Sequence, residues 1–273
     1  MISRAYVIPN YSCNLDCPHC EIHKRYNPRQ DYNKIIDAVR EVKAKENIVF
    51  GGEPSLNIFM FESLITSGDI TSVSTNLVAH PPAMWRRWGD ILKRHEVSVA
   101  TSWNYKRFTD TQYHQWLANL SELNIADVDT MVLITLTPDL IASGHSKILN
   151  VLNDIEITGC TKFLFEPFIG DTSVDFHCEV DEWLCLFHDV YFGKMTNVLE
   201  KRLDNWKCNC DDIVTIHPDG TIIKGCPDSL SVDRGLVPND CLLCDNTDKC
   251  RPCKLQKYCS YPKALARKLG VIC

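Results

Sequence analysis

The distribution of cysteine is the sequence feature that most restricts how this chain can fold. The chain has 273 residues, of which 15 are cysteine. Three of them, Cys13, Cys17 and Cys20, lie near the N-terminus, whereas nine crowd between Cys208 and Cys273. The N-terminal residues show no apolar stretch followed by a small-residue cleavage site, so no export signal is indicated. We therefore expect a cytoplasmic protein, in which thiolates bind metal rather than form disulfides.

Composition excludes several classes of protein. The chain is 45% hydrophobic and 23% charged, which is typical of a globular protein and not of a disordered or fibrous one. No apolar run approaches the roughly 18–20 residues that a membrane span needs, so we expect no membrane partner. A formal net charge of −6 disfavours duplex nucleic acid as the main partner.

Residues 3 to 168 alternate short β-branched runs with longer amphipathic stretches. Strands are predicted at 5–8, 47–50, 70–75, 97–101, 130–135 and 162–165. Helices are predicted at 31–45, 57–66, 82–95, 109–124 and 138–157, with Asp110 and Asp139 as caps or first-turn charges. This alternation predicts an α/β fold with a parallel sheet, whose functional site lies at the carboxyl ends of the strands.

The C-terminal part of the chain follows a different pattern. Residues 212–216 and 221–224 predict a β-hairpin around the turn 217–220, in which Gly220 supplies a positive φ. Residues 227–262 contain few apolar side chains, so metal coordination has to supply folding free energy, on the order of 10 kcal/mol per site. A short basic helix is predicted at 262–271. The predicted domains are 1–168, a connecting segment at 169–207, and a small cysteine-rich metal-cluster domain at 208–273.

The N-terminal cysteines follow the first predicted strand with the spacing C-x3-C-x2-C. Three thiolates on one short loop can converge on a zinc ion, with His19 or His23 as the fourth ligand. They can equally hold an iron–sulfur cube that leaves one iron open to another ligand. The spacing alone does not distinguish these two sites.

Two further motifs stand at the ends of predicted strands: Gly51-Gly52-Glu53-Pro54 after the second and Ser74-Thr75-Asn76 at the third. Together with the cysteine spacing they resemble the radical SAM enzymes. The resemblance implies a partial (β/α)6 TIM-type barrel and a [4Fe–4S] cluster on the three cysteines. It also implies S-adenosylmethionine (SAM) bound to that cluster, with the Glu53 carboxylate contacting its ammonium group. The two glycines allow close approach of the backbone to a ligand.

Two positions depart from the family pattern. His19 stands where an aromatic residue usually lies beside the adenine, although an imidazole can also stack. The stretch from Thr101 to Asn104 resembles the S-x-D sequence of a subgroup, with Asn104 where an acid is common, and it makes Ser102 a candidate for the SAM ribose. The residues predicted to bind the cofactor are His19, Gly51, Gly52, Glu53, Ser74, Thr75, Asn76 and Ser102.

The cysteine-rich tail resembles the SPASM/twitch extension of radical SAM enzymes. That resemblance implies one or two auxiliary [4Fe–4S] clusters, although the cysteine register is ambiguous and a zinc ribbon is the alternative. The predicted tail ligands are Cys208, Cys210, Cys226, Cys241, Cys244, Cys250, Cys253, Cys259 and Cys273. The three scattered cysteines, Cys160, Cys178 and Cys185, are interpreted as small buried hydrophobic residues.

SPASM-bearing relatives mostly act on peptides, so the resemblance implies crosslinking or oxidation of a peptide or protein side chain. It also implies a reduced flavodoxin- or ferredoxin-type electron donor. Because only 12 residues precede Cys13, a separate leader-peptide-binding protein, direct capture of the substrate, or a small substrate would each fit. Two alternatives stay open: a radical SAM enzyme for a nucleotide-derived or other small metabolite, and a non-catalytic, zinc-stabilised binding protein. Iron and sulfide content would separate the last from both enzymes.

Overall fold

The structure is a computed structural model that describes residues 2–17, 20, 29–167 and 212–224. Several predictions lie outside these residues: His19, His23, the connecting segment, the helix at 262–271 and the tail cysteines from Cys208 to Cys273. By compactness the chain divides into two units. The first comprises Met1–Thr135, Ile148–Phe165 and Cys210–Cys226, and the second comprises Leu136–Lys147, Glu166–Asn209 and Pro227–Cys273.

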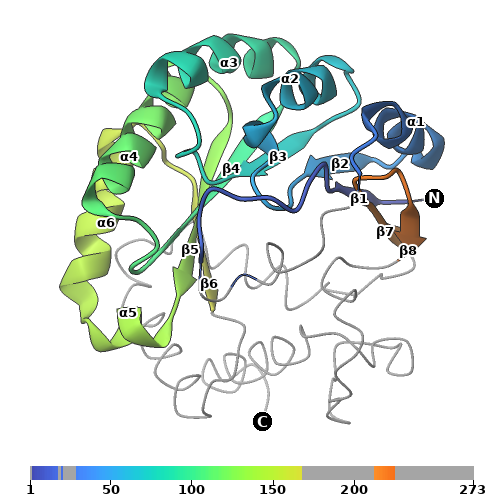
Figure 1. The fold of residues 1–273 in the computed structure, drawn as a ribbon. Coiled ribbons are helices and arrows are strands. Elements are labelled where there is room, and N and C mark those ends of the chain that lie inside the picture. Colours follow the sequence, from blue (N-terminus) through green and yellow to red (C-terminus); the bar gives the residue numbers. More distant parts are fainter. Residues whose placement is uncertain (1, 18–19, 21–28, 168–211, 225–273) are drawn as a thin grey trace, which may run out of the picture. The chain divides into compact units, whose positions relative to one another are not determined.

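The described strands form an eight-stranded sheet in the order β6-β5-β4-β3-β2-β1-β7-β8 (Figure 1). Pairing is parallel from β1 through β5 and between β1 and β7, and antiparallel between β7 and β8. The strands are β1 (Arg4–Val7), β2 (Glu46–Val49), β3 (Ser72–Thr75), β4 (Ser98–Asn104), β5 (Thr130–Leu136), β6 (Phe163–Pro167), β7 (Ile213–Ile216) and β8 (Ile222–Lys224). Each of the predicted strands is therefore present, within a few residues of its expected ends.

The connecting helices α1 to α4 lie along one face of this sheet (Figure 1). The described helices are α1 (Tyr32–Val42), the 3-10 helix η1 (Pro54–Leu56), α2 (Ile58–Thr66), α3 (Pro82–Arg94), α4 (Asp110–Ile125), α5 (Pro138–Ala142) and α6 (His145–Ile157). Among the described residues, no helix is long and apolar enough to cross a membrane. The expected α/β fold with a partial TIM-type barrel is confirmed.

Alternation along the strands separates two faces of the sheet. In β4 the side chains of Val99, Thr101 and Trp103 are buried, whereas Ser98, Ala100 and Ser102 between them are only half-buried. Thr101 accepts a hydrogen bond from the indole of Trp116 on α4 at 2.9 Å, so the buried face is the helix-facing one. Because side chains alternate with a period of two, the half-buried residues of β3 and β4 line the opposite, inner face of the sheet.

One local prediction needs correction, and a second is met in one of its two forms. The predicted helix at 138–157 is two helices, because the chain turns at Gly144 with φ +85°, a conformation that interrupts a right-handed helix. The N-terminal caps of α4 and α5 are Thr109 and Thr137, whose hydroxyls accept backbone N–H bonds. Asp110 and Asp139 are first-turn charges, which was one of the two expected roles.

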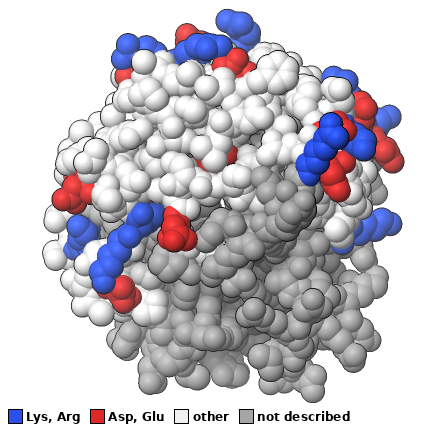
Figure 2. All heavy atoms as spheres, viewed as in Figure 1, with Lys and Arg blue, Asp and Glu red and all other residues white. Residues whose placement is uncertain are grey.

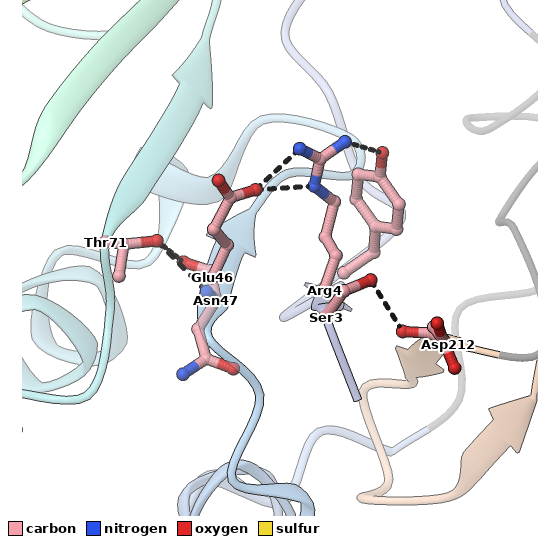
Figure 3. A network of polar contacts seen from close by, with 7 residues as sticks. Ser3, Arg4, Glu46, Asn47, Thr71 and Asp212 are labelled. Carbon is pink, nitrogen blue, oxygen red and sulfur yellow. Dashed lines mark hydrogen bonds and ion pairs between the residues drawn. The ribbon is translucent and has the colours of Figure 1, made fainter. Parts of the chain in front are cut away.

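The predicted β-hairpin is present as β7 and β8, and it belongs to the same sheet as β1. Backbone pairing runs from Arg4 opposite Ile213 to Val7 opposite Ile216. Polar contacts fasten the amino-terminal ends of these strands: the Ser3 hydroxyl donates to the carbonyl of Asp212 at 3.0 Å (Figure 3). The adjacent pair β1 and β2 is joined there by the Arg4 guanidinium and the Glu46 carboxylate at 2.6 Å.

Charged side chains gather over the outer helices, and the centre of the face in Figure 2 shows mostly uncharged atoms. Several of these charges form ion pairs between neighbouring helices, such as Arg87 with Glu62 at 2.8 Å and Arg86 with Glu122 at 2.6 Å. Over the described part of this face, positive and negative side chains are interspersed.

Candidate active site

The loop that carries the N-terminal cysteines is joined to the Gly51–Glu53 loop by backbone hydrogen bonds. The N–H of Gly52 donates to the carbonyl of Asn10 at 3.1 Å, and the N–H of Glu53 donates to the carbonyl of Ser12 at 2.7 Å. The Asn10 side chain returns a hydrogen bond to the carbonyl of Glu53 at 3.2 Å. These contacts bring two sequence motifs, which are about 40 residues apart in the chain, together at the carboxyl ends of β1 and β2.

Both glycines are needed for this approach. A Cβ atom at Gly52 would lie 2.0 Å from the carbonyl oxygen of Ser12, and one at Gly51 would lie 2.7 Å from the carbonyl oxygen of Asn10. Gly51 also has φ +143°, which side-chain-bearing residues rarely adopt. The expected approach of these glycines to a ligand stays a prediction. The described backbone that approaches them is the cysteine loop itself.

Glu53 is completely buried at this junction. One carboxylate oxygen, Oε1, accepts hydrogen bonds from the N–H of Ser55 at 3.1 Å, the hydroxyl of Ser55 at 2.6 Å and the hydroxyl of Thr75 at 2.7 Å. The second oxygen, Oε2, accepts one from the N–H of Asn76 at 2.7 Å. Since each carboxylate oxygen has about two acceptor positions, Oε2 keeps capacity for one more donor, such as an ammonium group.

Asn76 connects Glu53 to the cysteine loop. Its side-chain amide donates to the Asn14 side chain at 2.7 Å and lies 3.7 Å from the sulfur of Cys13. The N–H of Leu15 also points at that sulfur, at 3.4 Å. Donors aimed at a cysteine sulfur stabilise its thiolate and tune a cluster bound to it.

The three cysteines have the chemistry that a metal cluster requires. Burial raises the pKa of the Cys13 thiol, with the N–H of Leu15 acting in the opposite direction and the Glu53 charge adding to the rise. Burial also raises the pKa of the Cys17 thiol, which the Arg107 charge lowers and the sulfurs of Cys20 and Cys13 raise further. Bound metal would offset this repulsion between thiolates, so the residues present fit an iron–sulfur cluster.

The ligand geometry itself stays a prediction. Within residues 2–17, 20, 29–167 and 212–224, no three His, Cys, Asp or Glu side chains are arranged so that they could hold a metal ion.

Cys160 lies outside the N-terminal cysteine loop. It is buried, and its sulfur lies near the carbonyls of Lys162 and Thr130. This placement agrees with the interpretation of Cys160 as a small buried residue.

The predicted ribose-contacting residues divide between the two faces of the sheet. Thr75 is buried, and its hydroxyl is bonded to Glu53, so it acts on the site through that carboxylate. Ser74 is half-buried on the inner face, where it pairs with Ala100 across to β4. Ser102 is also half-buried on this face, and its carbonyl and hydroxyl both accept hydrogen bonds from the Arg107 guanidinium.

Several residues of the site carried no assignment to the cofactor in the sequence. Arg107 follows β4 and faces Ser102, with an Nε that is buried and has no hydrogen-bond partner among the described residues. Ser55 could have been found, because a glutamate followed by proline is a typical start of a short helix, and Glu53 caps η1. Asn10, Asn14 and Tyr11 have roles that depend on contacts across the fold, which no local pattern reveals.

No family profile matches the chain. Among curated proteins, 7-carboxy-7-deazaguanine synthase from Haemophilus influenzae is 31% identical over 74 residues, which cover 26% of this chain and 35% of that protein. The matching stretch thus spans about a third of the length of this curated relative.

Solved structures match over more of the chain. Native anSMEcpe with bound AdoMet (SAM) superposes with a TM-score of 0.60 at 14% identity, covering 81% of this chain and 74% of that chain. Streptococcus suis SuiB bound to S-adenosylmethionine superposes with a TM-score of 0.62 at 13% identity, covering 92% of this chain and 66% of that chain. At these identities the likeness shows the fold.

Both neighbours were solved with S-adenosylmethionine bound, and the chain shares their fold. This fold agrees with the resemblance drawn from the cysteine spacing and the Gly51–Pro54 motif. The SPASM/twitch assignment concerns residues outside the described ranges and stays a prediction.

Proposed function

We propose that this chain is a radical SAM enzyme. The observation that carries the proposal is the junction of the cysteine loop with Gly51–Glu53, in which Asn76 bonds both Glu53 and the Cys13 side of the loop. A cluster-binding loop and a buried carboxylate for an ammonium group are what SAM needs when it chelates an iron. Neighbours solved with bound SAM support the same function.

In this proposal Cys13, Cys17 and Cys20 hold a [4Fe–4S] cluster, which when bound supplies the electron that cleaves SAM to a 5′-deoxyadenosyl radical. Glu53, through its second carboxylate oxygen, accepts a hydrogen bond from the SAM ammonium. Ser74 and Ser102 on the inner face of the sheet contact the ribose, and His19 stacks beside the adenine. The hydrogen-abstraction chemistry that SAM and the cluster would supply belongs in the barrel interior, where the walls would shield it from water.

The test is anaerobic reconstitution of the full chain with iron and sulfide, followed by reduction with dithionite in the presence of SAM. We expect 5′-deoxyadenosine from the unaltered chain and none from a variant in which Cys13, Cys17 and Cys20 are all alanine. The control is Cys160→Ala, which removes a buried cysteine away from the loop and is expected to retain SAM cleavage. Cleavage of SAM by the triple variant would contradict the proposal.

The substrate we propose is a peptide or protein side chain, which the enzyme crosslinks or oxidises. Support comes from the structural neighbour anSMEcpe, which has also been solved with AdoMet and a peptide, at a TM-score of 0.60. On the inner face, Ser74, Ala100 and Ser102 are small and half-buried. Mass spectrometry of a candidate peptide after turnover tests this assignment. The expected product is a peptide that has lost hydrogen.

A small nucleotide-derived metabolite is the second candidate substrate. The observation that favours it is the 31% identity over 74 residues to a 7-carboxy-7-deazaguanine synthase. The two candidates can be distinguished by hydrogen transfer, because only the true substrate passes hydrogen to 5′-deoxyadenosine. Deuterium transferred from a labelled peptide or from a labelled metabolite would identify the class.

The remaining parts of the proposal concern the tail and the partners. We propose that the tail cysteines hold one or two auxiliary [4Fe–4S] clusters that serve substrate oxidation or binding. A cytoplasmic, reduced flavodoxin- or ferredoxin-type donor would supply electrons, and a separate protein would bind a peptide leader. The alternative of a non-catalytic zinc-binding protein predicts zinc without iron or sulfide in the purified chain.

A further inference from the structure

The β7–β8 hairpin reaches the cysteine loop through its turn. Parallel pairing of β7 with β1 is continued at the carboxyl ends of the strands, where the N–H of Ile8 donates to the carbonyl of Ile216 at 2.8 Å. The turn that follows, from His217 to Gly220, therefore lies next to the residues that lead from β1 into the cysteine loop. At the opposite ends of these strands, the Ser3–Asp212 contact fixes the register (Figure 3).

This turn contacts both ends of the segment that contains the three cysteines. At the first end, the hydroxyl of Tyr11 is hydrogen-bonded to Nδ1 of His217 at 2.5 Å, and Tyr11 is only 6% exposed. At the second end, the N–H of Asp31 donates to the carbonyl of Pro218 at 2.8 Å. Cys13, Cys17 and Cys20 all lie between Tyr11 and Asp31.

The second end is further held by the start of α1. Asp31 caps this helix by accepting a hydrogen bond from the N–H of Lys34 at 3.2 Å. Gly220 of the turn packs on Lys34, since a Cβ atom on Gly220 would lie 2.5 Å from the Cβ of Lys34. Gly220 also has φ +84°. Only glycine allows this close contact of the turn with α1.

We infer that Tyr11 and His217 are positioning residues for the cluster that cleaves SAM, an inference that rests on the proposed role of the three cysteines. A loop whose two ends are fixed on one rigid turn samples fewer conformations, so its thiolates are held ready for the cluster. The hydrogen bond between Tyr11 and His217 is the side-chain part of this attachment. The remaining contacts are made by the backbone, which substitution does not remove.

The variants that test the inference are Tyr11→Phe, His217→Phe and His217→Asn, with Tyr113→Phe as control. Asparagine keeps a hydrogen-bonding group near the position of Nδ1, whereas phenylalanine removes it. Tyr113 donates a hydrogen bond to Asp154 at 2.8 Å, so its change removes a half-buried tyrosine hydroxyl that lies outside the cysteine loop and the turn. Each full-length variant is reconstituted with iron and sulfide, and only preparations with matched iron content are compared.

The readouts are the SAM-dependent change in the electron paramagnetic resonance spectrum of the reduced protein and the dissociation constant for SAM. We expect both phenylalanine variants to alter the spectrum and to raise the dissociation constant about fivefold, which is about 1 kcal/mol. The double variant Tyr11→Phe with His217→Phe should bind SAM no more weakly than either single variant. His217→Asn should restore both the spectrum and the dissociation constant. Tyr113→Phe should match the unaltered chain.

The outcomes separate this inference from the proposed function. An unaltered chain without any SAM-dependent spectrum would contradict the proposed function itself. An unaltered chain with that spectrum, together with phenylalanine variants that match it, would overturn only the positioning role. If the phenylalanine variants lose iron or fail to fold, recovery in His217→Asn supports the role, and failure to recover overturns it.

Discussion

Replacement of Gly52 by alanine would test the packing of the cysteine loop most directly. The new Cβ would lie 2.0 Å from the carbonyl oxygen of Ser12 and 2.7 Å from the backbone carbon of Tyr11. These are backbone atoms, so no side chain can rotate away to make room. The two loops have to separate, and the hydrogen bonds from Gly52 to Asn10 and from Glu53 to Ser12 are lost or stretched.

The expected cost follows from those two bonds. Each contributes about 0.5–1.5 kcal/mol net, so together they give about 1–3 kcal/mol of unfolding free energy. For a chain of this size that corresponds to a fall in melting temperature of about 2–5 °C. The displaced loop should also lose its cluster, which lowers the iron content by about four atoms per chain.

The assay is thermal denaturation monitored by circular dichroism, combined with iron analysis after anaerobic reconstitution. Gly68→Ala is the matched control, because Gly68 has φ +79° but no atom within 4 Å of its would-be Cβ. It adds backbone strain of about 1–2 kcal/mol without a clash, and it should keep its full iron content. A Gly52→Ala variant with unchanged iron and melting temperature would refute the proposed contact between the loops.

Three further predictions concern the same site and the tail. Glu53→Gln should keep the iron content but weaken SAM binding by about 1.5–3 kcal/mol, measured by equilibrium titration, and unchanged affinity would place Glu53 outside the SAM site. In the metal-free chain, burial raises the pKa of the Cys13 and Cys17 thiols. Less thiolate is therefore present at pH 8 than in an unfolded chain, and alkylation by iodoacetamide should speed up as the pH rises above 9; equal rates in folded and unfolded chains would contradict this. With Cys13, Cys17 and Cys20 all replaced by alanine, the tail should retain about eight irons for two clusters or about four for one, and zinc in place of iron would exclude auxiliary clusters.

The strands and most helices could be predicted from the sequence because their patterns are local. In α1, for example, Ile35, Ile36 and Val39 recur on one helical face, and all three are buried. The division between α5 and α6 was missed because one glycine inside an apolar periodic stretch does not by itself end a helix. The structure shows that Gly144 has the positive φ that interrupts it.

The candidate site was predictable only where a motif carries its own chemistry. The cysteine spacing and the glutamate after two glycines made Cys13 and Glu53 candidates, and the structure brings their loops together. Neither the hydrogen bond of Thr75 to Glu53 nor the contact of Tyr11 with His217 could be predicted so directly. Thr75 depends on the position of a neighbouring loop, and His217 depends on which strand its hairpin pairs with.

The pairing of β7 with β1 limits how this chain can be shortened. A fragment that ends near residue 168 would keep the cysteine loop and the Gly51–Pro54 motif, but it would leave one side of β1 without its partner strand. An open parallel edge with the apolar residues Ala5 and Val7, both fully buried in the intact chain, invites association with other copies. The hairpin thus protects an aggregation-prone edge, and the barrel and the hairpin have to be expressed together for a monodisperse protein.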